Sequence, residues 1–309
     1  MQVLSVSSLK GGVGKTTVAL GLASAALNRG IATLFIDMDP QCDATNGLAA
    51  ENEFGASIAD VLVSPKLTTI KRAIGTSSWH TGKGAVFDVM HGSPRALTLD
   101  NPRPSMNDVW RLEEALSRIE NEYQLVIIDT PPSINALTRT AWVASDRVVV
   151  VTEPSFFSVV AADRARTAIN EISSRLTPRL DLFGVVVNRL RTQSNEHEYR
   201  LRELREMFGE RLLHPYFEER AAIQQATGAA RPIHSWPAEG AAEIAKGFDW
   251  ILSAALADME RNQKKNKAAV AGRTMRGQQI EEVIGLKDVP SDEDARNSRS
   301  AKKRRMFGR

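Results

Sequence analysis

The residues that most constrain the fold are glycines that separate an apolar segment from a helix-like one. Residues 2–8 read QVLSVSS, and residues 16–30 read TTVALGLASAALNRG, with apolar residues at helical spacing before a terminal glycine. Between them lies LKGGVGK, residues 9–15. A buried strand that turns through glycines into a helix is the first unit of an α/β fold. Ligands of such folds bind where the strand ends and the helix begins.

The alternation of apolar runs and helical segments continues to about residue 258. Near-continuous Val, Ile and Leu runs occupy residues 32–39, 85–93, 124–130, 146–154 and 182–190, and segments of helical period occupy residues 105–122, 159–176 and 239–260. Such runs are typical of strands buried on both faces of a parallel sheet. We therefore predict an α/β fold with a mostly parallel central sheet and helices on both faces.

Charge divides the chain into two parts. Residues 259–309 contain 14 Lys and Arg against 7 Asp and Glu, whereas residues 1–258 contain 26 against 30, so the basic charge belongs to the C-terminal part. That part is poor in aromatic residues and in helical period, which predicts a disordered basic tail at 259–309 behind a folded domain at 1–258. No apolar stretch reaches the roughly 18 residues that span a bilayer, so we expect a cytoplasmic protein.

The glycine loop has the chemistry of a phosphate site. Glycines allow backbone N–H groups to turn toward phosphate oxygens, and the helix that follows adds the positive end of its dipole. Lys15 can reach the β- and γ-phosphates, and the Thr16 hydroxyl can ligate Mg²⁺. Leu9 stands where the usual phosphate loop has its first glycine. The predicted nucleotide-binding set is Lys10, Gly11, Gly12, Val13, Gly14, Lys15, Thr16 and Thr17.

The segment KGGVGKTT, residues 10–17, resembles the deviant Walker A motif of the ParA/MinD family of dimeric ATPases. The resemblance covers roughly residues 1–258, is closest to ParA proteins of the Soj type, and implies the P-loop NTPase fold. It implies that ATP closes a homodimer in which Lys10 reaches the partner's phosphates. A lysine set apart from the cradle can neutralise developing phosphate charge as an arginine finger does. Lys10, Lys15 and Asp39 would then be the catalytic residues.

Three acidic residues end two of the apolar runs. Asp37 and Asp39 lie in FIDMDP, and Asp129 ends LVIID. Any one of them alone would be unremarkable, but together with a phosphate loop they predict a magnesium site. The resemblance implies that Asp39 positions the attacking water, that Asp129 holds the Mg²⁺-bound water, and that Asp37 supports the ion. The predicted metal set is therefore Thr16, Asp37 and Asp129.

The predicted contacts with the adenine base depend on the resemblance alone. VVVNRLR matches a family segment whose asparagine, Asn188 here, bonds the purine edge, and Pro215 and Tyr216 would lie near the base. From the residues alone, an asparagine at a strand end, as Asn188 is, is more often a plain turn residue. The TEPS segment favours MinD and the DPQ segment favours ParA, so the subfamily stays open.

The resemblance to ParA implies nonspecific binding of nucleoid DNA by the ATP dimer and stimulation of hydrolysis by a ParB-like partner. Such binding is directed at phosphates and needs a basic face. The predicted DNA-binding residues are Arg189, Arg191 and Arg231, with the basic tail as a further candidate. The arginines of residues 200–205 alternate with glutamates, which indicates a solvated helix face with ion pairs. Where some members carry DNA-contacting arginines, this chain has Ala238, Glu239 and Gly240.

Other classes of function compete with DNA partition. A MinD-like protein would bind the membrane, but AKKRRMFGR offers only Met306 and Phe307 as apolar anchors. A ParA-like ATPase could also position a protein cargo. Metabolic enzymes with this loop include ATP-dependent synthetases and the nitrogenase iron protein, whose cluster the single Cys42 cannot ligate. We predict a slow Mg²⁺-ATPase, associated with the nucleoid, that partitions or positions a chromosome or plasmid.

Overall fold

The computed structural model describes residues 1–79 and 86–284, and it describes side chains as far as Lys264. The chain divides into a compact unit, Met1–Met259, and a second unit, Glu260–Arg309. Nothing in the described residues is both long and apolar enough to form a membrane-spanning helix. The predicted tail residues 285–309 lie outside the described part.

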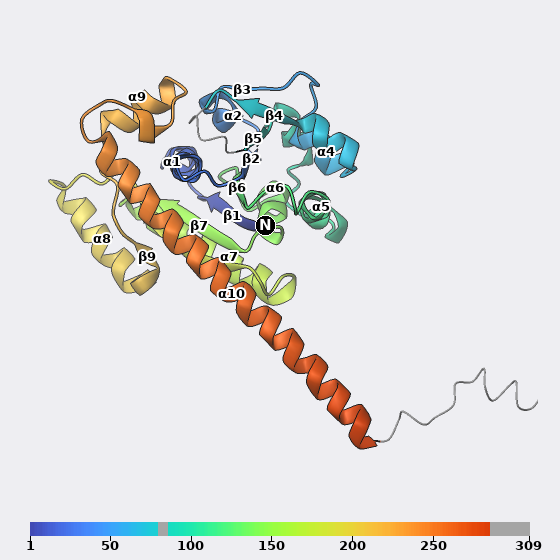
Figure 1. The fold of residues 1–309 in the computed structure, drawn as a ribbon. Coiled ribbons are helices and arrows are strands. Elements are labelled where there is room, and N and C mark those ends of the chain that lie inside the picture. The colour runs from blue at the N-terminus through green and yellow to red at the C-terminus, as the bar shows by residue number, and fades with distance from the viewer. Residues whose placement is uncertain (80–85, 285–309) are drawn as a thin grey trace, which may run out of the picture. The chain divides into compact units, whose positions relative to one another are not determined.

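A sheet of nine strands forms the centre of the first unit (Figure 1). Its order is β3-β4-β5-β2-β6-β1-β7-β8-β9. Neighbours from β5 to β9 pair in parallel, and β3 and β4 add an antiparallel edge. The strands are β1 (Gln2–Ser7), β2 (Thr33–Asp37), β3 (Ala50–Glu51), β4 (Ile74–Ser77), β5 (Phe87–Met90), β6 (Leu125–Asp129), β7 (Arg147–Thr152), β8 (Asp181–Val187) and β9 (Leu212–Leu213).

Helices follow most of the strands, which confirms the predicted fold class. They are α1 (Lys15–Asn28), α2 (Asp43–Gly47), α3 (Ile58–Val63), α4 (Leu67–Ala73), α5 (Met106–Ser117), α6 (Ala136–Val143), α7 (Phe156–Arg175), α8 (Asn195–Phe208), α9 (Ala221–Gly228) and α10 (Ala241–Ile284). Short 3₁₀ turns lie at η1 (Pro94–Leu99), η2 (Gly209–Arg211) and η3 (Ile233–Ser235).

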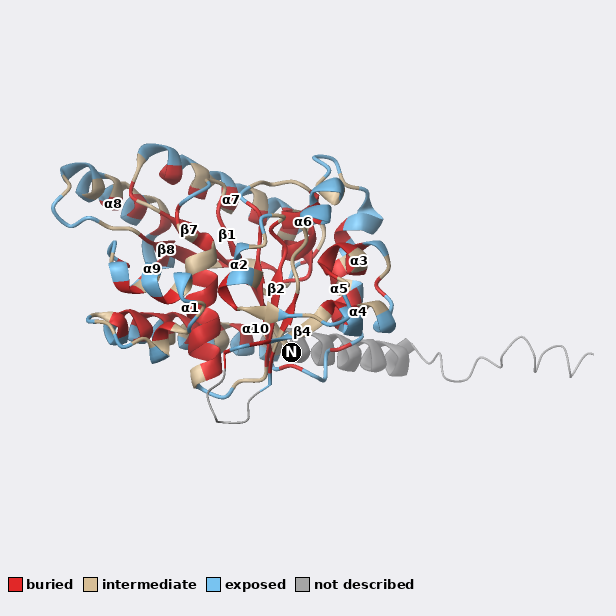
Figure 2. Cartoon of the chain, turned by 90° about the horizontal axis from the view of Figure 1, so that it is seen from above, coloured by how far each residue is buried: buried red, intermediate tan, exposed pale blue. Residues whose placement is uncertain are grey.

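The strands bury side chains on both faces because successive residues point to opposite sides of the sheet. Leu4 and Val6 of β1 pack in one apolar cluster with α1, α9 and α10. Val3 packs in a second cluster with α3, α5 and α6, while Val148 and Val150 of β7 pack in a third with α7 and α8. Figure 2 shows the buried residues gathered along these central strands and along α1.

The structure contains elements that the sequence pattern did not predict. Strands β3 and β4 and helices α2, α3, α4, α6 and α9 are short, and their segments lack a clear hydrophobic period. Helix α10 continues to Ile284, past the point at residue 258 where we predicted disorder. Residues 259–284 are rich in Ala, Lys, Arg, Gln and Glu and contain no proline, so the local propensity favours continuation of the helix.

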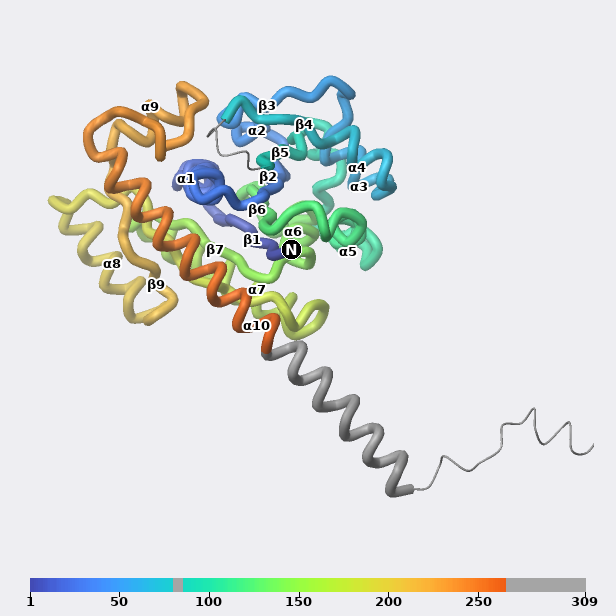
Figure 3. Tube along the Cα trace, in the orientation of Figure 1, coloured from blue at the N-terminus to red at the C-terminus, as the bar shows by residue number. Residues whose placement is uncertain are grey.

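The order of the central strands brings distant residues to one edge of the sheet. In β1, Val6 is opposite Asp129 of β6, and Ser7 is opposite Val150 of β7. In β2, Asp37 is also opposite Asp129. Figure 3 shows the tube of β1 between those of β6 and β7, although β1 ends at Ser7 and the other two begin only at Leu125 and Arg147. The loops after β2, β6 and β7 therefore meet the glycine loop after β1.

Candidate nucleotide site

The loop between β1 and α1 has a backbone that only glycine adopts readily. Gly12 has φ 84° and Gly14 has φ 87°, both in the left-handed region. The Val18 N–H donates to the Gly14 carbonyl at 3.0 Å, so the first turn of α1 forms directly on the loop. Nothing lies within 4 Å of a side chain built on Gly11 or Gly12. This open side of the loop can receive an anionic group beside the N-terminus of α1.

Lys15 is the buried cation of the site. Its ammonium donates to Asp129 Oδ1 at 2.6 Å and lies 3.5 Å from Asp39 Oδ2, and its side chain is only 7% exposed. Burial acts against the charged form, but Asp129 and then the other carboxylates raise the pKa of Lys15 above its usual value. The side chain therefore presents a fixed positive charge at the end of the sheet.

Thr16 and Asp129 provide oxygen ligands next to Lys15. The Thr16 hydroxyl donates to Asp129 Oδ2 at 2.8 Å, and the Asp129 side chain is fully buried. Among the described residues no group of three or more His, Cys, Asp or Glu is arranged to hold a metal. Mg²⁺ needs no such cage, because it keeps waters and binds one or two protein oxygens together with phosphates. The residues present therefore fit this ion.

The two acids after β2 have different surroundings. Asp37 is fully buried and accepts hydrogen bonds from the N–H and hydroxyl of Thr45, at 2.8 and 2.7 Å, and from the Asp39 N–H at 3.1 Å. Burial, followed by the charge of Asp129, raises the pKa of Asp37 to about 7. Because both of its oxygens already bind protein groups, Asp37 supports the turn. This geometry offers no support for the predicted role of Asp37 at the metal ion.

Lys10, the first lysine of the loop, lies against a residue that we did not predict. Its ammonium is 2.5 Å from Glu153 Oε1 and 3.2 Å from the Ser155 hydroxyl. Glu153 directly follows β7, the neighbour of β1 in the sheet. The sequence motif TEPS contains no signal of this pairing, which depends on the strand order. The two lysines of the loop are thus bound to different acids.

Asn188, which we predicted to bond the purine edge, contacts the phosphate loop. The Asn188 Nδ2 group donates to the Val13 carbonyl at 2.9 Å. Residues after it line a cavity of about 430 Å³, formed by Leu190, Arg191, Thr192, Gln193, Ser194, Glu218 and Glu219. Pro215 and Tyr216 are not among these residues. Pro215 faces Gly247 of α10, and the Tyr216 ring lies against that of His214 at an interplanar angle of 35°, so these contacts do not support the predicted contact with a base.

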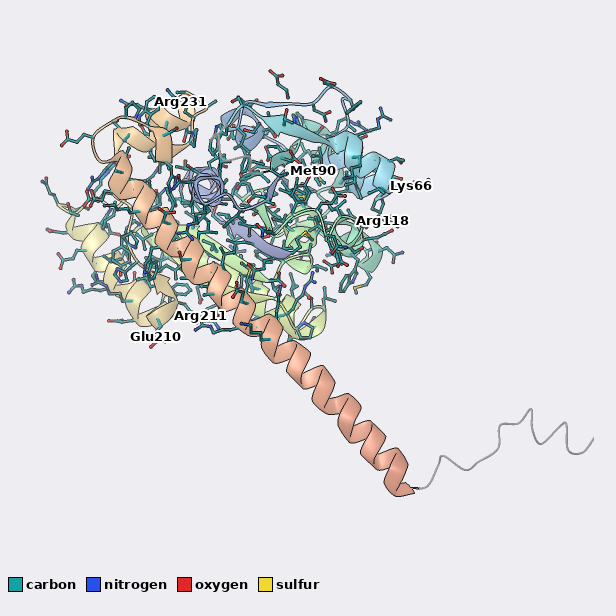
Figure 4. The ribbon with its side chains drawn as sticks, in the orientation of Figure 1. Lys66, Met90, Arg118, Glu210, Arg211 and Arg231 are labelled. Atoms are coloured by element: carbon teal, nitrogen blue, oxygen red, sulfur yellow. The ribbon has the colours of Figure 1, made fainter. Side chains whose placement is uncertain are left out.

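Two of the three predicted DNA-binding arginines lie near one acidic residue, Glu219. Arg191 forms a salt bridge with Glu219 at 2.8 Å, and Arg189 lies near the same carboxylate. Arg231 is exposed, and its guanidinium lies 6.0 Å from the Trp236 ring. Figure 4 shows Arg231 beside α9, while Arg211, which pairs with Asp181, lies at the far end of α8. Arg200 pairs with Glu196 and Glu203, as the pattern of α8 indicated.

Comparisons with known proteins agree with this geometry. The model of a family described as an AAA domain matches residues 1–182. The chromosome partitioning protein ParA of Caulobacter vibrioides is 28% identical over 240 residues, which are 75% of this chain and 86% of that protein. The virulence plasmid ParA family protein pGP5-D of Chlamydia psittaci is 32% identical over 192 residues, which are 60% and 68% of the two chains.

A solved structure extends the comparison to the fold. A variant of Cyanothece McdA, in complex with ATP, matches with a TM-score of 0.72 at 20% identity, over 82% of this chain and 96% of that one. A likeness at this identity concerns the fold alone. The family match, by contrast, covers the loop, the acids and the strands that hold them. This chain belongs to the ParA/MinD family, and the match to the AAA domain model covers residues 1–182.

Proposed function

We propose that this chain is an Mg²⁺-dependent ATPase whose ATP-bound homodimer binds DNA nonspecifically and releases it after hydrolysis. The observation that carries the proposal is the arrangement of Lys15, Thr16 and Asp129. A buried ammonium and a hydroxyl share one carboxylate, at 2.6 and 2.8 Å, directly beside a left-handed glycine loop. A structural role alone would not require an open loop and a helix N-terminus next to this charge.

Each group of the site has a chemical task in this proposal. The loop N–H groups and Lys15 bind the triphosphate, and Thr16 and Asp129 hold Mg²⁺, which supplies charge neutralisation when bound. Asp39 is 8% exposed; its Oδ1 accepts from the Gln41 N–H at 3.1 Å, and its Oδ2 lies 3.5 Å from the Lys15 ammonium. Oδ2 can therefore orient a water while Oδ1 keeps its hydrogen bond to the turn. Positioning and charge stabilisation then supply the rate.

The relatives' names support a role in partition, since two of them are partition or plasmid ParA proteins. We infer that the cargo is a chromosome or plasmid, that the protein is cytoplasmic and associated with the nucleoid, and that a ParB-like partner stimulates hydrolysis. McdA shares the fold, so a protein cargo is the second candidate, and a membrane surface is the third.

The charges of the chain indicate where DNA would bind. Arg191 and Arg200 are already neutralised by glutamates, whereas Arg231 forms no salt bridge within the described residues. Residues 259–309 carry twice as many basic as acidic residues. Phosphate-directed binding scales with the number of cations that reach the backbone. We therefore assign most of the binding to the basic C-terminal part, with a contribution from Arg231.

Co-sedimentation with random-sequence DNA or anionic liposomes, each with and without ATP, tests the function. We expect ATP-dependent pelleting with DNA, and the loss of most pelleting in a chain truncated after Gln263. The truncation must lie beyond Met259, because that side chain is fully buried. Pelleting with liposomes but not DNA would reject the DNA assignment in favour of the membrane, and pelleting with neither would favour a protein cargo.

Asp39→Ala tests the chemistry separately from the cargo. We expect this variant to bind ATP, to remain dimeric in gel filtration and to lose hydrolysis by at least about 100-fold, as expected for loss of a group that acts in the transition state. Asp43→Asn is the matched control, because Asp43 is an exposed acid four residues away. A variant with normal turnover would contradict the role of Asp39.

A further inference from the structure

Lys10 of the phosphate loop forms an ion pair with Glu153, a residue outside that loop. Lys10 and Glu153 lie on loops that follow adjacent parallel strands, β1 and β7. Their charged atoms are 2.5 Å apart, and the two side chains are 35% and 23% exposed. The pair is thus accessible, unlike the buried pair of Lys15 and Asp129.

Neighbouring hydroxyl groups fix the carboxylate of Glu153. Ser155 and Ser158 donate to Glu153 Oε1 at 3.2 and 3.4 Å, and the Ser155 N–H donates to the Glu153 carbonyl at 2.8 Å. Although partial burial opposes it, bonding by Lys10 and both serines lowers the pKa of Glu153 below its usual range. Glu153 is therefore a charged and preorganised acceptor at the start of α7.

Within the proposed function, this acceptor competes with the second copy of the chain. An ammonium held 2.5 Å from a carboxylate of its own chain must give up part of that attraction to reach a triphosphate bound to another chain. We propose that Glu153 is a positioning residue that holds Lys10 in the single chain and must release it when two copies close around ATP. Glu153 thereby sets the protein concentration at which ATP drives dimerisation.

The expected effect on dimerisation is modest, and its free energy counts twice because each copy of the chain releases one lysine. Accessible ion pairs contribute little to stability, so removal of the acceptor should favour release of each Lys10 by about two- to five-fold. A symmetric dimer releases two lysines, one from each copy. The dimer dissociation constant of Glu153→Gln should therefore fall by about four- to twenty-five-fold.

Sedimentation velocity of the full-length chain with Mg²⁺ and a non-hydrolysable ATP analogue measures this constant. We expect tighter dimerisation for Glu153→Gln, an intermediate value for Glu153→Asp, and weaker dimerisation for Lys10→Gln. In the Lys10→Gln background, Glu153→Gln should have no further effect. Glu171→Gln is the matched control, because Glu171 also lies on α7 and pairs with Arg175 at 2.9 Å. It should leave the dissociation constant unchanged.

A second measurement needs neither nucleotide nor dimer. Competitive acetylation, read by mass spectrometry on the nucleotide-free chain, compares Lys10 with the exposed Lys66 as an internal reference. Loss of the acceptor should raise the reactivity of Lys10 relative to Lys66 in Glu153→Gln, because the amine is no longer held against a carboxylate and reaches the reagent more freely. Glu171→Gln should not change this ratio.

The two measurements separate failure of this inference from failure of the proposed function. If the wild-type chain does not bind the analogue or dimerise, the proposed ATPase function fails, and the acetylation ratio still decides whether Glu153 holds Lys10. Unchanged or weaker dimerisation of Glu153→Gln would overturn the inference. So would an effect of that variant that persists in the Lys10→Gln background, or an unchanged acetylation ratio.

Discussion

Two lysines of the same loop differ in what surrounds them. Lys15 is buried between Asp129 and Asp39, whereas Lys10 is partly exposed and bound to Glu153. Burial strengthens an electrostatic interaction and makes its loss costly, while exposure to water allows an ion pair to exchange partners at little cost. The geometry therefore assigns to Lys15 a fixed role within the chain and to Lys10 an exchangeable one.

Lys15→Ala should abolish ATP binding in isothermal titration calorimetry. The change removes the only buried cation bonded to Asp129 among the described residues and leaves a fully buried carboxylate without it. We expect chemical denaturation to show a loss of about 3 kcal/mol in the free energy of unfolding, as for other broken buried pairs.

The double variant Lys15→Met/Asp129→Asn separates folding from binding. Removal of both charges should restore much of the lost stability, because no uncompensated charge stays buried. ATP binding should remain absent. If the double variant bound ATP as the wild type does, Lys15 would have no direct role at the phosphates.

The sequence predicted those site residues whose roles depend on local spacing. The glycine loop, Lys15 and Thr16 lie in one continuous segment, and Asp129 ends an apolar run that is recognisable as a strand. Glu153 was not predicted, because its partner is 143 residues away and the pairing follows from the order of β1 and β7. Asn188 was predicted at the site, but its bond to the Val13 carbonyl becomes visible only in three dimensions.

At the scale of elements, the loop after β1 depends on the end of β8. A side chain built on Gly14 would place its Cβ 2.1 Å from Asn188 Nδ2, the group that bonds the Val13 carbonyl. A side chain on Gly12 would meet nothing within 4 Å, although both glycines have left-handed backbones. The two positions therefore differ in packing and not in backbone strain.

Gly14→Ala should destabilise the chain more than Gly12→Ala does. Each variant incurs about 1–2 kcal/mol for a side chain in the left-handed region. Gly14→Ala must in addition displace Asn188, and loss of a buried hydrogen bond adds about 1–3 kcal/mol. Urea denaturation of both variants measures the difference. Equal losses would show that Asn188 does not hold the loop.

Element length explains which parts of the fold were predicted. Strands β1, β2, β6, β7 and β8 have five to seven residues and helix α7 has twenty, so their periods are visible in the sequence. Strand β3 has two residues and helix α3 has six, too few to establish a period. Helix α10 extends past the predicted boundary at residue 258, because residues 259–284 lack a clear hydrophobic period but have a composition that favours helix.

At the scale of the whole first unit, a histidine joins three elements. His234 in η3 bonds the Ser24 hydroxyl of α1 through Nδ1 at 2.7 Å, and its Nε2 lies 3.5 Å from Asp249 of α10. Burial lowers the pKa of His234, although Asp249 opposes this effect, and nearby Arg29 adds to it. The folded chain therefore favours the neutral ring. When the chain unfolds, the ring returns to its ordinary pKa of about 6.5 and takes up a proton below that pH.

Stability should consequently fall as the pH decreases below about 6.5, and the contribution of His234 should be fully present above that value. One such proton accounts for a slope of at most about 1.4 kcal/mol per pH unit. Urea denaturation between pH 7.5 and 5 should show a shallower slope for His234→Gln than for the wild type. His214→Gln, which alters an exposed ring, should keep the wild-type slope. Equal slopes in all three chains would refute the assignment.

The pairing of Asp129 with both Val6 and Asp37 has an evolutionary consequence. Because side chains alternate along a strand, one codon inserted within β6 would turn Asp129 to the opposite face, away from Lys15. Insertions in the connecting segments cost little by comparison, since closure entropy grows slowly with length. Related sequences can therefore vary widely in loop length, whereas β6 must keep its pairing register with β1 and β2.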